Sequence, residues 1–293
     1  TLKMEARQDS SDMKFYTTLI NGPTNKFYTF TAQINTVIRN NNGDLILKMI
    51  DSQGDVGADL GIRGSIEKNG FLFTLFPDEP IVAFRKMRLN QDNEIKLRDD
   101  GRVEANLHMD EPKSGMSISV VSNDTTIAKQ DLTIDLKKID VGDVIRAFPF
   151  LPDIDGLFSG NFHIIEHDKL RFIINSELKE GKYNGMLLGD LGLRAGYMPD
   201  SLFNRHIIGA QLTRNGKRVV SVGGNYQGET GELTRGLITL HGFPLTLIDG
   251  FVPNQMLRMQ GEAQGKLHVS GKLEQLKFNG EMKLDSAYAE VPM

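Results

Sequence analysis

Apolar and polar residues alternate along most of the chain. After the turn signal at residues 99–101, apolar side chains occupy every second position from Val103 to Met109, and the same period recurs around Leu267 and Val269. A period of two sends successive side chains to opposite faces of a strand. With turn signals about 8–14 residues apart, the pattern predicts an all-β chain of roughly 18 to 20 strands, each with one apolar face.

Individual strands are expected where β-branched and aromatic residues gather between turn signals. Residues 41–44 are typical of a hairpin turn, and Pro77 and Pro80 are expected to close the strand before them. The expected strands are 27–30, 45–49, 71–75, 81–89, 103–109, 116–120, 131–139, 162–164, 170–174, 186–188, 207–212, 219–222, 267–269, 276–278 and 282–284.

Two segments break the alternation. Residues 141–148 have apolar positions at helical spacing and end at Pro149, and residues 244–251 form a similar short apolar segment. Both are predicted to be short helices. They would lie either over an open groove or on an ordinary core.

The second part of the chain repeats itself. Ile134, Leu136 and Val141 recur at a shift of 104 as Ile238, Leu240 and Leu245, and residues 154–164 match 259–269 at a shift of 105. The sequence therefore predicts two copies of a strand, short helix, proline loop and glycine-separated strands in residues 131–293, after a strand array in residues 1–130. Such repeats suggest an array that extends by stacking, and we expect the chain to be a fragment of a longer protein.

Composition narrows the chemistry. The 293 residues include no Cys, which excludes disulfides, Cys metal sites and thiol nucleophiles, and the net charge of −4 is interspersed rather than gathered in a basic stripe. The aspartates at 99, 100, 153 and 155 stand in turns, where Asp is favoured for local hydrogen bonds. No nucleophile motif is present. We expect no enzyme, no cofactor, no metal and no nucleic-acid partner.

The C-terminal motifs resemble a known family. The run Phe243-Pro244-Leu245, the pattern from Met259 through Gly261 and Gly265 to the Val-Ser-Gly at 269–271, and the alternation from Leu276 to Leu284 resemble TamB-like (AsmA-like) translocation and assembly proteins. The resemblance covers residues 131–293 and is diffuse over 1–130. Its motifs are strand-and-glycine patterns, which specify architecture more than chemistry.

The resemblance implies a long, curved, open β-sheet, described as a half-pipe or β-taco, with an apolar concave face and a few short helices. It implies a periplasmic location, an inner-membrane anchor outside this segment, and a groove that carries phospholipid acyl chains toward the outer membrane. The candidate groove residues are Phe162, Ile164, Leu170, Phe172, Ile174, Leu245, Ile248, Phe251, Leu267, Val269, Leu276, Phe278, Met282 and Leu284.

Two alternatives stay open at this point. Without the resemblance, one-sided strands would pack their apolar faces together in a closed sandwich or barrel. An open sheet could also serve as a scaffold that pairs its edge strand with an outer-membrane β-barrel protein.

Overall fold

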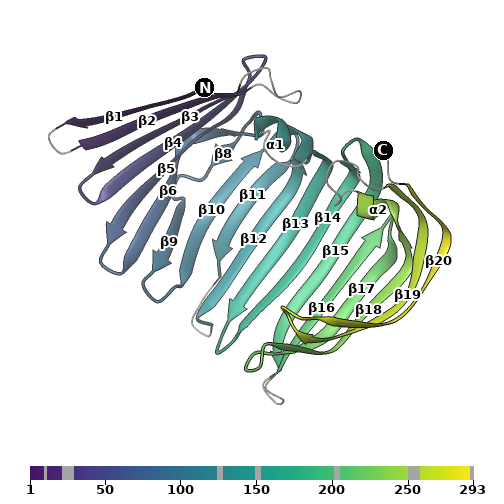
Figure 1. The fold of residues 1–293 in the computed structure, drawn as a ribbon. Helices are drawn as coiled ribbons and strands as arrows, with labels where there is room; N and C mark the ends of the chain where they lie inside the picture. Colours follow the sequence, from purple (N-terminus) through teal and green to yellow (C-terminus); the bar gives the residue numbers. More distant parts are fainter. Residues whose placement is uncertain are drawn as a thin grey trace. The chain divides into compact units, whose positions relative to one another are not determined.

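The computed structural model describes residues 1–9, 12–21, 30–123, 128–148, 153–200, 205–249 and 258–290. Over these ranges it contains twenty strands and two short helices, and the defined strand pairs are antiparallel. The chain divides into two compact units, Thr1–Ser159 and Gly160–Met293, with strand β13 containing the boundary (Figure 1). Each unit is an open antiparallel sheet, so the all-β open-sheet class is confirmed.

In the first unit, consecutive strands lie side by side except around the short strands β7 and β8, which pair with β6 and β10 while β6 also pairs with β9. Among the described residues β1 pairs with β2 alone, and the ladder continues through β6 to β9 and on to β12. Its elements are β1 (Leu2–Asp9), β2 (Asp12–Asn21), β3 (Phe30–Arg39), β4 (Asn42–Asp51), β5 (Val56–Glu67), β6 (Gly70–Val82), β7 (Arg85–Lys86), β8 (Arg88–Leu89), β9 (Glu94–Arg98), β10 (Val103–Glu111), β11 (Met116–Ser122), β12 (Gln130–Asp140), α1 (Val141–Ala147) and the start of β13 (Ile154–Glu166).

The register gives this sheet one apolar and one polar face. Residues paired across antiparallel strands share a face, and large apolar residues pair with one another at many positions of the ladder. Representative pairs are Leu2↔Leu19, Ile34↔Leu47, Leu45↔Ile62, Ile66↔Phe71, Phe71↔Leu97, Leu107↔Val120 and Ile118↔Leu136. The alternation predicted from the sequence is therefore kept in register from strand to strand.

The opposite face carries paired charges. The Arg63 guanidinium contacts Asp44 at 2.8 Å, and the Lys48 ammonium lies 3.4 Å from Asp59, each across neighbouring strands. Near the β9–β10 turn, Arg98 donates a 2.6 Å hydrogen bond to Glu104. Exposed pairs of this kind contribute little stability singly, about 0–1 kcal/mol, so they mark the solvated face rather than hold the sheet together.

Glu104 gives this face a predictable pH dependence. The hydrogen bond from Arg98 holds the pKa of the Glu104 carboxyl below its ordinary value of 4.5. A lowered folded-state pKa contributes stability above pH 4.5 that is lost as pH falls through the folded pKa. In urea titrations, Glu104→Gln is expected to lose less stability than the parent protein between pH 5 and pH 3. Equal losses in the two proteins would contradict this role.

Two strand predictions are wrong around residue 80. Pro77 and Pro80 do not close the strand, since β6 continues to Val82. They fall between the pairs Gly61↔Phe76 and Asp59↔Ile81, where the register shifts, so neither proline has to donate to the ladder. The expected strand 81–89 is also interrupted, because Ala83 and Phe84 have φ of 49° and 61° and turn the chain before β7 and β8.

Between β8 and β9, two asparagine side chains form hydrogen bonds with the backbone of neighbouring strands. Asn93 Oδ1 accepts from the Leu75 N–H at 2.6 Å, and its Nδ2 donates to the carbonyls of Leu75 and Asn90. Asn90 does the same toward β10, accepting from His108 N–H and donating to the Asn106 carbonyl. Each amide thus replaces a missing backbone pair, which leaves the neighbouring strand satisfied.

Removing the Asn93 amide should expose that dependence. Asn93 is 9% exposed, so Asn93→Ala leaves buried backbone groups of Leu75 without partners, and we expect a loss of about 2–3 kcal/mol in the free energy of unfolding. The matched control is Asn69→Ala in an exposed turn, expected within about 0.5 kcal/mol of the parent. Urea midpoints measure both, and similar values for the two variants would refute the role of Asn93.

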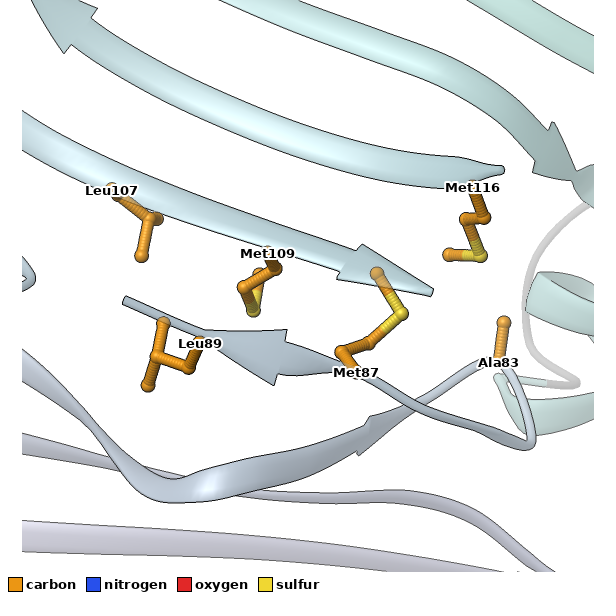
Figure 2. Packing of buried hydrophobic residues seen from close by; sticks show 6 residues of the cluster. All are labelled: Ala83, Met87, Leu89, Leu107, Met109 and Met116. Carbon is orange, nitrogen blue, oxygen red and sulfur yellow. The ribbon is translucent and has the colours of Figure 1, made fainter. Parts of the chain in front are cut away.

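The core of the first unit lies at one end of its apolar face. Ala83, Met87, Leu89, Leu107, Met109 and Met116 form a buried cluster in which β7, β8 and the turn before them meet β10 and β11 (Figure 2). We call this the methionine cluster. A second, smaller cluster contains Ala32, Met49 and Ala58, with Phe148 packed against it. Helix α1 contacts the methionine cluster through Val144, and Phe148, which directly follows the helix, contacts the second cluster.

The second unit follows the same plan. Its strands pair in sequence from β14 to β20, and β20 pairs with β19 alone among the described residues. The elements are the end of β13, β14 (Leu170–Tyr183), β15 (Met186–Asp200), β16 (Arg205–Arg214), β17 (Lys217–Gln227), β18 (Glu232–Pro244), α2 (Thr246–Asp249), β19 (Arg258–Lys272) and β20 (Lys277–Glu290). In Figure 1 the strands of this unit bend along their length.

Both predicted helices form. α1 covers 141–147 of the expected 141–148. α2 begins at Thr246, two residues after the expected start at 244, and its expected end at 250–251 lies outside the described residues, as do 27–29 of the first expected strand. The order strand, helix, strand occurs as β12–α1–β13 and again as β18–α2–β19. The compact units meet at Ser159, within β13, so the first of these motifs lies mostly in the first unit and the second lies in the second unit.

Candidate functional site

The candidate site is the apolar face of each sheet. In the second unit, Leu267 pairs with Ile238, and Val269 pairs with Phe278. Met282 and Leu284 lie on the same face, opposite Gly265 and Ala263. The register thus brings these candidates together over β18 to β20, although their sequence positions span two strands and a turn.

Exposure differs along that group. Phe278 is 60% exposed, Met282 and Leu284 are each 52% exposed, and Val269 is 4% exposed. Val269 is buried because it packs beside Gly236, where an added Cβ would come within 3.1 Å of the valine Cβ. Leu276 lies just before β20, which begins at Lys277, so the strand predicted from residue 276 starts one residue later. The open part of the face therefore consists of β20 side chains.

The polar residues of these strands face the other way. Lys266 pairs with Thr239 and Glu281, His268 with Leu237 and Asn279, and Lys283 with Gln264. Lys277 pairs with Ser270 on that same face. The apolar face is therefore free of these four basic side chains, which would lose hydration if an apolar ligand covered them.

A second group of candidates surrounds a shallow hollow. Phe162 and Ile164 from β13 and Leu170, Phe172 and Ile174 from β14 line a space of about 180 Å³, with His163 and Ile173 completing the lining. The alternation of strand residues predicted all five apolar members, and the β13–β14 hairpin brings them together. The hollow is small compared with pockets for drug-sized ligands, which are about 300–1,000 Å³, but wide enough for part of an alkyl chain.

An aromatic row continues from this hollow across the face. The Phe172 and Tyr197 rings stack with centroids 5.3 Å apart, Tyr197 stacks on His206 at 4.9 Å, and His206 meets Tyr226 at 6.3 Å. Burial raises the pKa of the Tyr197 hydroxyl above its ordinary value. Sequence reasoning missed Tyr197, His206 and Tyr226, because one aromatic residue on each of three strands forms a row only once the register is known.

The α2 candidates have a different environment. Leu245 and Leu247 are buried, at 4% and 7% exposed, and so is Ala263 of β19. The side chain of Ile248 and all of Phe251 lie outside the described residues. Leu245 is thus a core residue at the α2 end of the unit, where the short helix packs on β19.

The first unit has an open face that the candidate residues did not include. At the end of the strands that carries the turns at 40–41, 68–69 and 99–102, here called the hairpin end, Ile66 is 57%, Phe71 46% and Leu97 41% exposed. Ile66 and Leu97 both pair with Phe71, so the three side chains adjoin one another. The alternation could have identified Ile66 and Leu97, which each stand between polar neighbours, whereas Phe71 stands between Gly70 and Leu72 and is placed beside them only by the register.

At the other end, the same face is filled. Met116 is 0% and Met49 is 3% exposed, covered by α1 and the segment 83–89, whose own Met87 is 0% exposed. We call this the helix end. One apolar face therefore has a covered half and an open half, and nothing in the described part of this unit forms a second sheet over the open half.

Other chemistry is sparse. Within the described ranges, no three His, Cys, Asp or Glu side chains come together in a way that could hold a metal ion. The same ranges contain no helix that is long and apolar enough to cross a membrane. The site is thus defined by surface character rather than by reactive groups.

Comparison with known proteins found no matching family, no matching curated protein and no matching solved structure.

Proposed function

We propose that this chain is a non-catalytic segment of a periplasmic bridge that conducts phospholipid, with acyl chains lying on the apolar faces of its sheets. The single observation that carries the proposal is a one-sided apolar face on which large side chains such as Phe71 and Phe278 remain about half exposed. Exposed apolar patches of this kind mark interaction sites. A TamB-like bridge anchored in the inner membrane fits this arrangement and remains part of the proposal.

The chemistry of the face suits an acyl chain. Backbone N–H and C=O groups inside the ladder are paired with neighbouring strands, so an alkyl chain laid on the face would leave few polar groups without water or partners. Each buried methylene gains about 0.8 kcal/mol. Met and aromatic side chains add adaptable contacts that do not require one chain length.

Lipid extraction tests this proposal directly. The protein is purified without detergent from cells, and its organic extract is examined by mass spectrometry for phospholipid. We expect co-purified phospholipid, removed by treatment with a lipid-binding resin and regained on incubation with phosphatidylethanolamine vesicles. Protein that carries no phospholipid and takes up none from vesicles would overturn the proposal.

A second function is favoured by a separate observation. β20 pairs with β19 alone among the described residues, so its other edge presents backbone groups that can accept another strand. Its 14 residues are long enough for extended pairing. We propose, as the alternative, docking of an outer-membrane β-barrel protein by strand addition at this edge.

The two functions are separable by crosslinking. A photoreactive residue at Lys283 on β20 is expected to capture a barrel protein from outer-membrane extracts, whereas one at Asn175 on the interior strand β14 is not. Capture at both positions, or at neither, would remove the basis for edge pairing while leaving the lipid proposal intact.

A further inference from the structure

We infer that α1 is a releasable strap, which in its closed position hides the helix-end half of the apolar face in the first unit. The inference concerns regulation of the proposed lipid face and takes its biological meaning from that proposal. The movement itself can be tested without lipid.

The strap reaches far along the sheet. α1 follows β12 directly, yet it packs on β4 and β5, which stand on the far side of β6 to β11 in the ladder. At its C-terminal end, Ala147 lies so close to β5 that a Cβ added at Gly57 would come within 2.9 Å of the alanine Cβ. The absence of a side chain at Gly57 therefore leaves the room in which Ala147 packs against β5.

Charged side chains hold the helix at both sides. The Arg85 guanidinium lies 3.0 Å from Asp143 and 3.7 Å from Asp140, and Asp140 also caps the helix by accepting from the Asp143 N–H. Arg146 lies 3.7 Å from Asp51 of β4, and its guanidinium stacks 3.6 Å from the centroid of the Phe84 ring. We call these contacts of Arg85 and Arg146 the latch. The latch links α1 to β4 and to the segment after β6.

Beneath the latch lies the surface that would otherwise be open. Val144 packs on the methionine cluster, and Phe148 packs on Met49 and Ala58, which are 3% and 0% exposed. At the hairpin end, the same face has exposed side chains, and no element of the described residues lies over them. Lifting α1 would therefore uncover the Met49 and Ala58 part of the helix end and join it to the open half, while the segment 83–89 stays on the methionine cluster.

The strap is built to open more easily than the sheet. Seven residues are too few for an isolated helix to persist in water, so α1 depends on its contacts. Only Ile145 and Ala147 of the helix are buried, and the arginines of the latch remain 32% and 45% exposed at their side chains. Elements with few buried contacts and solvent-exposed pairs open at lower free energy than the core.

Cysteine labelling measures the opening, since the chain contains no other cysteine. The reporter is Ala58→Cys, beneath the strap, and its maleimide labelling rate is followed in folded protein. Two changes act on the strap. The latch variant is Arg85→Gln/Arg146→Gln, and the wedge variant is Gly57→Leu, whose side chain would overlap both Ala147 and the Phe84 ring on which Arg146 stacks. We expect each to raise the labelling rate about tenfold or more.

Matched controls separate strap movement from general loosening. Gly43→Leu places the same side chain on β4 where an added Cβ meets only the Val37 carbonyl at 3.8 Å, and should leave labelling unchanged. Ala105→Cys, 5% exposed on β10, should label at one slow rate in every background. If Ala58→Cys labels no faster in the latch and wedge variants, or if Ala105→Cys accelerates equally, the strap is refuted.

A lipid arm distinguishes the strap from the proposed function. Photoreactive residues at Met49, beneath the strap, and at Phe71, on the open half, are irradiated with palmitoyl-oleoyl phosphatidylethanolamine vesicles. The strap predicts adducts at Phe71 in all backgrounds and at Met49 at least fivefold more in the latch variant. Opening without adducts at either site would retain the strap and refute lipid binding, whereas equal Met49 adducts in parent and latch variant would refute the strap as its regulator.

Discussion

Replacing Met116 by aspartate is expected to destabilise the first unit by about 4 kcal/mol, because the change buries an unpaired carboxylate and leaves a cavity. Met116 is 0% exposed, within the methionine cluster at the helix end of the sheet (Figure 2). Urea unfolding followed by circular dichroism measures the loss, and Met116→Leu, which nearly conserves volume, should cost less than about 1.5 kcal/mol.

The informative comparison is Phe71→Asp on the open half of the same face. Phe71 is 46% exposed, so its aspartate stays hydrated, and we expect a loss of about 1 kcal/mol or less. In a closed sandwich both aspartates would be buried, and both variants would unfold easily. Losses of similar size for Met116→Asp and Phe71→Asp would therefore contradict an open face at the hairpin end.

An aspartate on the exposed part of either apolar face should impair lipid binding more than it impairs folding. We expect Phe71→Asp in the first unit, or Phe278→Asp in the second, to lower bound phospholipid at its own unit about tenfold or more, because an acyl chain cannot cover a carboxylate without dehydrating it. Lipid transfer from labelled vesicles, with lipid quantified by mass spectrometry, measures the effect.

Charge on the polar face provides the control for that result. Lys277 precedes Phe278 on β20 and points to the other face, so Lys277→Asp changes net charge without touching the proposed lipid surface. It should retain parent-level lipid. If Lys277→Asp loses as much lipid as Phe278→Asp, net charge rather than the apolar face governs binding.

Much of this architecture could be predicted from local sequence. The alternation from Val103 to Met109 and around Leu267 specified strands with one apolar face, and the spacing from Val141 to Phe148 specified α1 almost to its ends. These features depend on neighbouring residues only, through the periods of strand and helix. The open-sheet class then came from the family resemblance, since one-sided strands alone favour a closed sandwich or barrel.

The features that could not be predicted from local sequence depend on which distant residues the strand register places side by side. Tyr197, His206 and Tyr226 form a row only when three strands are aligned, and Asn93 acts as a strand substitute only because β6 lies beside it. The seat of Ala147 at Gly57 joins residues 90 positions apart. Pro77 misled because prolines usually end strands, whereas here a register shift accommodates it.

The most direct test of an acyl-chain surface is the periodicity of lipid crosslinks along two strands. Photoreactive residues are placed singly at Phe71, Leu72 and Phe73 on β6 and at Lys277, Phe278, Lys283 and Leu284 on β20, then irradiated with phosphatidylethanolamine vesicles. Acyl chains lying on the apolar faces should give adducts at Phe71, Phe73, Phe278 and Leu284 and none at Leu72, Lys277 and Lys283, a period of two that follows the register. Adducts of equal yield on both faces, or on neither, would contradict it.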